Sequence, residues 1–323
     1  MDDNSFQPIN KNCIFIASAG RSSNRFLSRL IKNSIEDCFS VHEPDLLVLV
    51  QTDEWLEKIK HFGLFNMTIG KFTYAGSPRG IGLAREHGKM NDPAAMRQFY
   101  SLRQKYISGI KQTIYSESNL QLTGLIDLLP KMFPNSTTAY IMRDGRTWVR
   151  SFMNWKLDMY GKLDIFSYFP SGRASADQFP DDPFFQKWDQ LTRFQKICWQ
   201  WQHRNRRALD LLKNNPSSLL VKYEDLFDPV NGHDTMQKLL DHLTQFPDGF
   251  RAKFKYNPDF AKKRFYASES KKLSKWDSWP LELVKQFDEV CGEFHLEQGY
   301  GREPLWQEML LKSKTLDKII APL

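Results

Sequence analysis

The sequence contains few cysteines and no long apolar run. Its four cysteines, Cys13, Cys38, Cys198 and Cys291, form no CxxC pair and have no histidine cluster beside them, so we expect no metal site. No stretch approaches the ~18 apolar residues of a membrane-spanning helix. The polar, acidic N-terminus MDDNSFQPINKN is unlike a signal peptide. We therefore expect a cytoplasmic protein with no membrane partner.

Two common nucleotide-binding motifs are missing as well. Neither the GxxxxGK[ST] motif of P-loop enzymes nor the GxGxxG fingerprint of dinucleotide-binding folds follows the first predicted strand. Charge is present in quantity, with 45 Lys and Arg against 38 Asp and Glu, a net charge of +7. This basic excess suits an anionic ligand, but on charge alone it suits nucleic acid or a solvated surface equally well.

The chain alternates short apolar strands with helices. Residues 13–17 (CIFIA) form an apolar run typical of a strand buried on both faces, and the turn-like SAGRSS leads into a helix with apolar residues at helical spacing. Further strands are predicted around LQLTG at residue 120, at 137–142 and at 218–223. This order predicts an α/β fold, a single domain over residues 1–323 with a central parallel sheet flanked by helices.

Two long segments interrupt this alternation. Residues 44–110 are predicted to be mostly helical and contain a Gly-rich patch, whereas residues 156–195 are aromatic and irregular. Long insertions of this kind in a compact domain are often functional. Their aromatic content favours lids over a substrate pocket.

Two segments carry residues suited to anions. The loop that begins at Gly20 joins the first strand to the first helix, so its backbone N–H groups and Arg21 suit an anion, although a basic residue there is often only structural. Arg143 ends a predicted strand, and Ser151 follows eight residues later, two turns into the next helix. An arginine in this place can bind a phosphate through two N–H groups while the serine hydroxyl adds a further bond.

Together these segments resemble the sulfotransferases that use 3′-phosphoadenosine 5′-phosphosulfate (PAPS). GRSSNRF at 20–26 resembles the family's 5′-phosphosulfate loop, and RDGRTWVRS at 143–151 resembles its 3′-phosphate motif. Tyr223-Glu224-Asp225 and the C-terminal KW…CGEFHLEQGYG resemble two further signatures. The resemblance implies a sulfotransferase fold similar to P-loop nucleotide kinases. It also implies transfer of a sulfuryl group from PAPS to a hydroxyl of a small-molecule acceptor, leaving adenosine 3′,5′-bisphosphate.

The resemblance also implies roles for individual residues. Arg21 would contact the sulfuryl group, Arg143 and Ser151 would bind the 3′-phosphate, and Phe26 and Tyr223 would contact adenine. The backbone cradle for the 5′ end would consist of Gly20, Arg21, Ser22, Ser23, Asn24 and Arg25. This cradle departs from the family pattern, because Ser23 replaces a glycine and Asn24-Arg25 replaces a threonine pair. Candidates for the family's C-terminal phosphate clamp are Lys271, Lys272 and Lys275.

The transfer needs a general base within reach of the acceptor hydroxyl. No histidine lies between His87 and His203, which excludes the base that some members of the family carry there. Other members place a glutamate after the second strand, and VHEPD puts Glu43 at that position. Other candidates for the catalytic site are His42, Glu117 and Asn119, and Glu43 itself could instead be a turn carboxylate.

Two other classes of function stay open. A P-loop kinase-like phosphotransferase would need a Lys-Ser/Thr pair and an acidic strand end for magnesium, and the loop offers neither. A non-catalytic nucleotide-binding protein on the same fold is compatible with the altered residues 23–25. The sequence predicts no nucleic-acid partner and is compatible with a homodimer.

Overall fold

A computed structural model describes residues 8–46, 55–155, 158–261 and 272–320. The chain divides into two compact units. Unit 1 comprises Met1–Met142, Phe169–Arg173 and Arg207–Phe265, and unit 2 comprises Arg143–Tyr168, Ala174–Arg206 and Tyr266–Leu323. The single domain expected from the sequence stays a prediction, and each unit is described by itself.

Unit 1 is built on a five-stranded sheet in the order β2-β3-β1-β4-β5, in which every pair is parallel. The strands are β1 Asn12–Ser18, β2 Cys38–His42, β3 Ile114–Ser118, β4 Ser136–Met142 and β5 Ser218–Lys222. The chain leaves β1 towards β2 and leaves β4 towards β5, so the connections diverge at the carboxyl ends of the neighbouring strands β1 and β4. Parallel sheets usually bind their ligands outside such a point. The predicted α/β fold class is confirmed.

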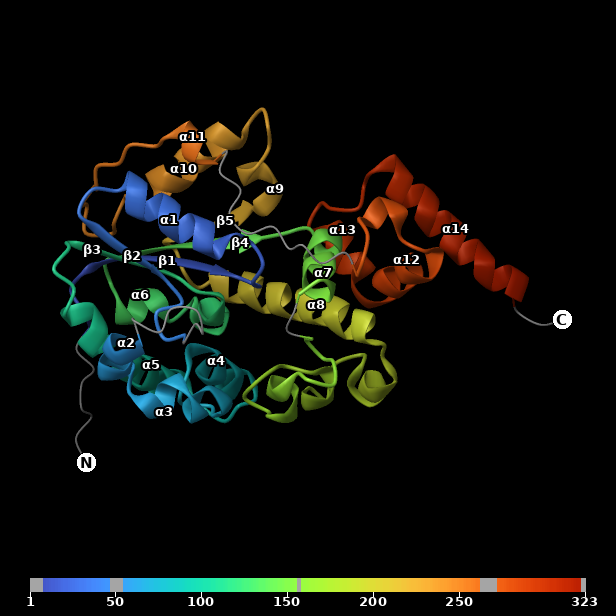
Figure 1. The fold of residues 1–323 in the computed structure, drawn as a ribbon, viewed down its shortest axis with the longest axis horizontal. Coiled ribbons are helices and arrows are strands. Elements are labelled where there is room, and N and C mark those ends of the chain that lie inside the picture. Colours follow the sequence, from blue (N-terminus) through green and yellow to red (C-terminus); the bar gives the residue numbers. More distant parts are fainter. Residues whose placement is uncertain (1–7, 47–54, 156–157, 262–271, 321–323) are drawn as a thin grey trace. The chain divides into compact units, whose positions relative to one another are not determined.

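Helices cover both faces of this sheet (Figure 1). One face carries α1 Asn24–Ser34, α9 Tyr223–Leu226, α10 Gly232–Leu243 and α11 Pro258–Ala261. The other carries α2 Trp55–Phe62, α3 Leu64–Met67, α4 Pro78–Glu86, α5 Asp92–Ser108 and α6 Leu129–Met132, with 3-10 helices η2 Ile69–Phe72 and η3 Leu120–Leu125. Alternate side chains of β1 serve the two layers. Ile14 and Ile16 join the core formed with α1 and α10, whereas the ring of Phe15 lies 5.1 Å from that of Phe133.

Unit 2 is mostly helical. Its helices are α7 Gly145–Met153, α12 Leu281–Phe287, α13 Glu293–Glu297 and α14 Pro304–Ile320, with α8 Arg193–Leu212 continuing into unit 1. Its shorter elements are the 3-10 helices η4 Ile165–Tyr168, η5 Ala176–Gln178, η6 Phe185–Gln190 and η7 Trp276–Ser278 and the π-helix η8 Asp288–Gly292. Asp144 caps α7 by accepting from the backbone N of Arg146 at 2.7 Å, and its carboxylate is held by the Arg146 and His295 side chains. This network fixes the start of the helix that carries Ser151.

The strand predicted around LQLTG is wrong. These residues form η3, and the strand is the preceding segment, β3. Asn119 ends the strand because its Oδ1 accepts from the Gln121 backbone N at 2.9 Å, and Thr123 then donates to Ser18 O and Leu120 O. All five residues of β3 are buried, although its sequence, IYSES, is largely polar.

The two predicted lid segments differ in helix content, as expected. Residues 55–108 hold α2 to α5 and η2, whereas residues 158–192 hold only short 3-10 turns. Residues 47–54 and 156–157 of these segments lie outside the described residues. A role as lids stays a prediction. Within the described ranges, no helix has the length and apolar character needed to cross a bilayer.

Candidate active site

The loop after β1 has an unusual backbone. Gly20, Arg21 and Ser23 all have positive φ, at 91°, 55° and 64°. For the two non-glycine residues this left-handed conformation costs roughly 1–2 kcal/mol each, and such strain is concentrated at functional sites. Backbone of this kind turns N–H groups to one side and forms an anion-binding concavity. Ser23, the N-cap of α1, makes no side-chain capping bond, so the loop and the helix N-terminus together suit an anion.

Asn24, the first residue of α1, has a buried donor without a partner. Its Oδ1 accepts from Ser18 Oγ at 2.8 Å, which fixes the orientation of the amide, and the residue is only 6% exposed. Nδ2 is enclosed and makes no hydrogen bond in the part of the chain that the structure describes. An unsatisfied buried donor costs about 1–3 kcal/mol. An anionic oxygen within hydrogen-bond reach of Nδ2 would satisfy it, so Asn24 is compatible with an anionic donor at the loop.

Glu43 and His42 lie at the carboxyl end of β2. Glu43 has a φ of 46°, and its backbone N donates to Ser118 O at 3.2 Å. Burial, with the negative charge of Asp45 adding to it, raises the pKa of Glu43 from 4.5 to about 7. Burial lowers the pKa of His42 to about 4, so the ring is neutral and its Nδ1–H donates to Ser118 O at 2.9 Å. His42 Nε2 lies 3.7 Å from Glu43 Oε2.

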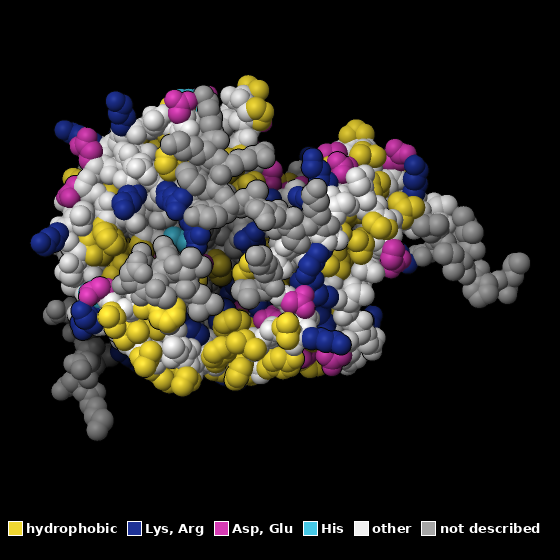
Figure 2. Space-filling model, viewed as in Figure 1, with side chains coloured by type: hydrophobic (Ala, Val, Ile, Leu, Met, Phe, Trp, Pro, Cys, Tyr) yellow, Lys and Arg dark blue, Asp and Glu magenta, His cyan; other side chains and the backbone are white. Residues whose placement is uncertain are grey.

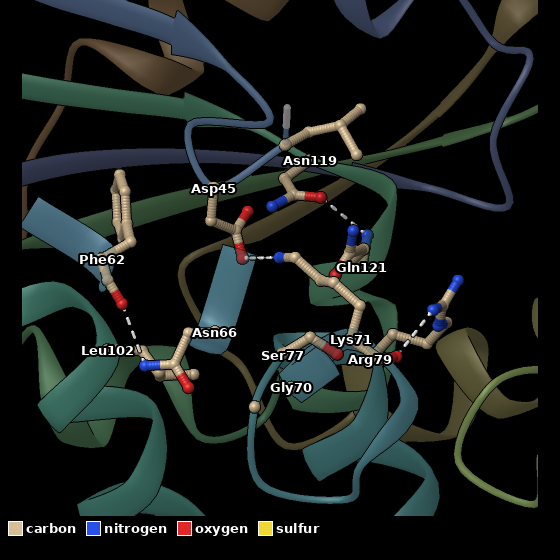
Figure 3. Close-up of polar contacts among 12 residues, drawn as sticks. Asp45, Phe62, Asn66, Gly70, Lys71, Ser77, Arg79, Leu102, Asn119 and Gln121 are labelled. Carbon is tan, nitrogen blue, oxygen red and sulfur yellow. Dashed lines mark hydrogen bonds and ion pairs between the residues drawn. The ribbon is translucent and has the colours of Figure 1, made fainter. Parts of the chain in front are cut away.

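A chain of four buried charges adjoins Glu43 on the side of α5 and η2. Lys71 Nζ donates to Asp45 Oδ2 at 2.7 Å, and Figure 3 shows this contact. Arg103 Nη2 lies 3.4 Å from Asp45 Oδ1, and Arg103 Nε donates to Glu117 Oε2 at 2.9 Å. Burial alone would raise the pKa of Asp45, but the charges of Lys71 and Arg103 lower it well below its usual range. Asp45 is therefore a fixed negative charge beside Glu43.

Glu117 has a different environment from Glu43. It is fully buried, and its two oxygens accept from Arg103 Nε and Nη2, from Tyr115 Oη at 2.7 Å and from Asn119 Nδ2 at 2.8 Å. A carboxylate with four donors has no oxygen left for a substrate proton. This geometry is typical of a structural role for Glu117 and Asn119, and a catalytic role for Glu43 stays a prediction.

The two predicted adenine contacts come together in one aromatic cluster. Phe227 lies between them, with ring centroids 5.3 Å from Phe26 and 4.8 Å from Tyr223. Phe26 is 6% exposed and packs in the core, whereas Tyr223 is half-buried. A nucleotide contact by either ring stays a prediction.

The residues predicted to bind the 3′-phosphate belong to unit 2. Arg143 directly follows β4 in the chain; its Nε donates to Thr147 Oγ1 at 2.9 Å and its carbonyl accepts from Trp201 Nε1 at 2.9 Å. Ser151 lies two turns along α7, as the spacing predicts. Lys272 and Lys275 are exposed, and Lys271 lies outside the described residues. Phosphate binding by these residues stays a prediction.

Asp45, Lys71 and Gln121 were missed by the reasoning from the sequence. Asp45 stands two residues after Glu43, so the motif itself offered a signal. Lys71 gave none, because its partner Asp45 is 26 residues away in the chain (Figure 3), and no motif marks Gln121. No group of three or more metal-ligating side chains occurs among the residues that were described.

Two solved structures that are similar to this chain are sulfotransferase domains. The one from the curacin biosynthetic pathway is 13% identical, with 89% of this chain and 98% of that chain covered and a TM-score of 0.43. The one from the Synechococcus PCC 7002 olefin synthase is 15% identical, with 90% and 98% covered and a TM-score of 0.36. No model of a protein family matches the chain, and no curated protein matches it in sequence. Because TM-scores below 0.5 do not establish a shared fold, we base the functional proposal on the chain's own residues.

Proposed function

We propose that this protein is a sulfotransferase that moves a sulfuryl group from PAPS to a hydroxyl of a small-molecule acceptor. One observation carries the proposal: at the carboxyl end of the sheet, a strained loop suited to an anion follows β1, and a buried carboxylate whose pKa is about 7 follows β2. An anion loop alone would suit any phosphate ligand. An acceptor alcohol also needs a general base with a pKa near 7 to take its proton.

In the proposed reaction the acceptor oxygen attacks the sulfur of PAPS in line with the bond to the 5′-phosphate. The new O–S bond forms as the S–O bond to the phosphate breaks, and the hydroxyl proton passes to Glu43. Arg21 stabilises the negative charge that develops on the bridging oxygen, as in other loose group transfers. The leaving group is adenosine 3′,5′-bisphosphate, whose 3′-phosphate Arg143 and Ser151 bind in this proposal.

The departure of Ser23 from glycine is compatible with this role. Ser23 has a φ of 64°, the left-handed conformation that glycine adopts without strain. The backbone therefore has the shape that the missing glycine would favour. This observation supports donor binding despite the altered loop.

The proposal is tested by incubating the purified protein with PAPS and a metabolite extract. A compound should gain the mass of one SO₃ group only when protein and PAPS are both present, and Glu43→Gln should slow this gain ~10²–10⁴-fold. Calorimetry should show tighter binding of adenosine 3′,5′-bisphosphate than of AMP. Equal affinity would refute the PAPS assignment, and binding without any product would identify a non-catalytic nucleotide-binding protein. Location in the cytoplasm, a homodimer and the absence of nucleic-acid and membrane partners stay predictions.

A further inference from the structure

Gln121 in η3 is a nearly buried amide with an unused hydrogen-bond acceptor. Its backbone N donates to Asn119 Oδ1, and the residue is 9% exposed. Its side-chain Oε1 is enclosed and accepts no hydrogen bond from any residue that the structure describes. Buried amide oxygens nearly always have a partner, so an orphaned one points to a ligand.

Gln121 follows β3 at the carboxyl end of the sheet, where the proposed base Glu43 follows β2. It is the third residue past β3, as Asp45 is the third past β2, and these two strands are neighbours in which His42 pairs with Ser118. Figure 3 shows two contacts in this region, between Gln121 and Asn119 and between Asp45 and Lys71.

Asp45 also has a buried side-chain oxygen without a hydrogen bond. Its Oδ1 is buried and makes no hydrogen bond among the described residues; the Arg103 guanidinium at 3.4 Å is an ion-pair contact. Two buried oxygens at the ends of neighbouring strands thus make no hydrogen bond among the described residues, although Asp45 Oδ1 is ion-paired with Arg103. Gln121 Oε1 is a hydrogen-bond acceptor, so the partner that would satisfy it is a hydrogen-bond donor.

We propose that Gln121 binds the substrate that receives the sulfuryl group, and that this substrate carries a second hydroxyl or an amino group near the hydroxyl that reacts. The inference rests on the proposed function and deepens it: the substrate class is that of diols, polyols and amino alcohols. A second hydroxyl donates to Gln121 Oε1. A simple alkyl alcohol leaves that oxygen buried and unpaired, which a polar site discriminates against.

Gln98 supplies a matched control. It lies in α5 of the same unit, and its Nε2 donates to Ala75 O at 2.9 Å. Gln98→Met therefore removes an internal hydrogen bond, whereas Gln121→Met removes none that involves the side-chain oxygen. The melting temperature should fall in Gln98→Met and should stay equal or rise in Gln121→Met.

The substrate preference is measured by saturation-transfer NMR titration of 1,2-propanediol and 1-propanol, with and without adenosine 3′,5′-bisphosphate. The two probes differ by one hydroxyl, and a single net hydrogen bond gives the wild type a preference for the diol of ~2- to 12-fold. The preference should vanish in Gln121→Met and persist in Gln98→Met. It should also persist in Gln121→Glu, which retains a hydrogen-bond-accepting oxygen.

Equal binding of the two probes by the wild type would overturn the inference. A preference that survives Gln121→Met, or a melting temperature that falls as far as in Gln98→Met, would do the same. The proposed function fails by a different result, namely no binding of adenosine 3′,5′-bisphosphate and no sulfated product. A protein that sulfates an acceptor without a Gln121-dependent preference refutes only the substrate class.

Discussion

Replacing Glu43 by glutamine should make the protein more stable and less active, with a pH dependence that follows from burial. The folded pKa is about 7 against 4.5 for an unperturbed glutamate. At about 1.4 kcal/mol per pKa unit, ionising Glu43 in the folded state costs about 3 kcal/mol. Below pH 4.5 both states are protonated and the cost is absent. It grows as the pH rises towards 7 and is constant above that.

Glu43→Gln lacks this cost, since the amide stays neutral. Urea unfolding near pH 8 should show the variant to be more stable by up to ~3 kcal/mol, and near pH 4.5 the two proteins should be alike. Exposed Glu36 supplies the control, because Glu36→Gln should change stability equally at both pH values. Turnover of the wild type should rise with pH and level off above 7. Turnover of the variant should be ~10²–10⁴-fold lower and should no longer rise with pH in this range.

Two results would refute this reasoning. A gain in stability that is the same at both pH values would show that the Glu43 carboxylate is not desolvated. Retention of more than about a third of wild-type turnover, far from the ~10²-fold loss expected of a missing base, would make Glu43 a turn residue.

Three further predictions concern the donor. Arg143→Ala should weaken binding of adenosine 3′,5′-bisphosphate ~10- to 150-fold by calorimetry, since a charged phosphate contact contributes about 1.5–3 kcal/mol; unchanged affinity contradicts the role. Arg21→Ala should lower turnover ~10²–10³-fold and nucleotide affinity far less, and a defect in binding alone would make Arg21 a phosphate anchor. Ser23→Gly should raise stability by about 1 kcal/mol in urea unfolding because it relieves the left-handed strain, and a loss would show that the serine side chain contributes more than its φ costs.

The fold class could be predicted because its signals are local. CIFIA followed by small residues and a helical pattern marks β1, its loop and α1 without knowledge of the rest of the chain. β3 escaped prediction because IYSES becomes buried only through distant partners. Glu117 meets Arg103 across the packing of α5, and Ser118 Oγ donates to Asn24 O.

The candidate site, like the fold, could be predicted from the sequence only in part. Glu43 could be singled out through the resemblance to the sulfotransferase family, because some members carry a glutamate after the second strand. The different environments of Glu43 and Glu117 needed the structure, because both are carboxylates near strand ends. Only the donors around Glu117 and the raised pKa of Glu43 separate them.

The enclosed chain of Lys71, Asp45, Arg103 and Glu117 has a consequence for ionic strength. Mobile ions screen charges in solution over about 8 Å at physiological salt, but they do not penetrate a buried ion pair. The proposed donor, by contrast, approaches through the electrolyte with several negative charges. Added potassium chloride should therefore lower kcat/KM for PAPS while leaving kcat at saturating donor and the melting temperature nearly constant. A kcat that fell in parallel with kcat/KM would show that salt reaches the charges around the base.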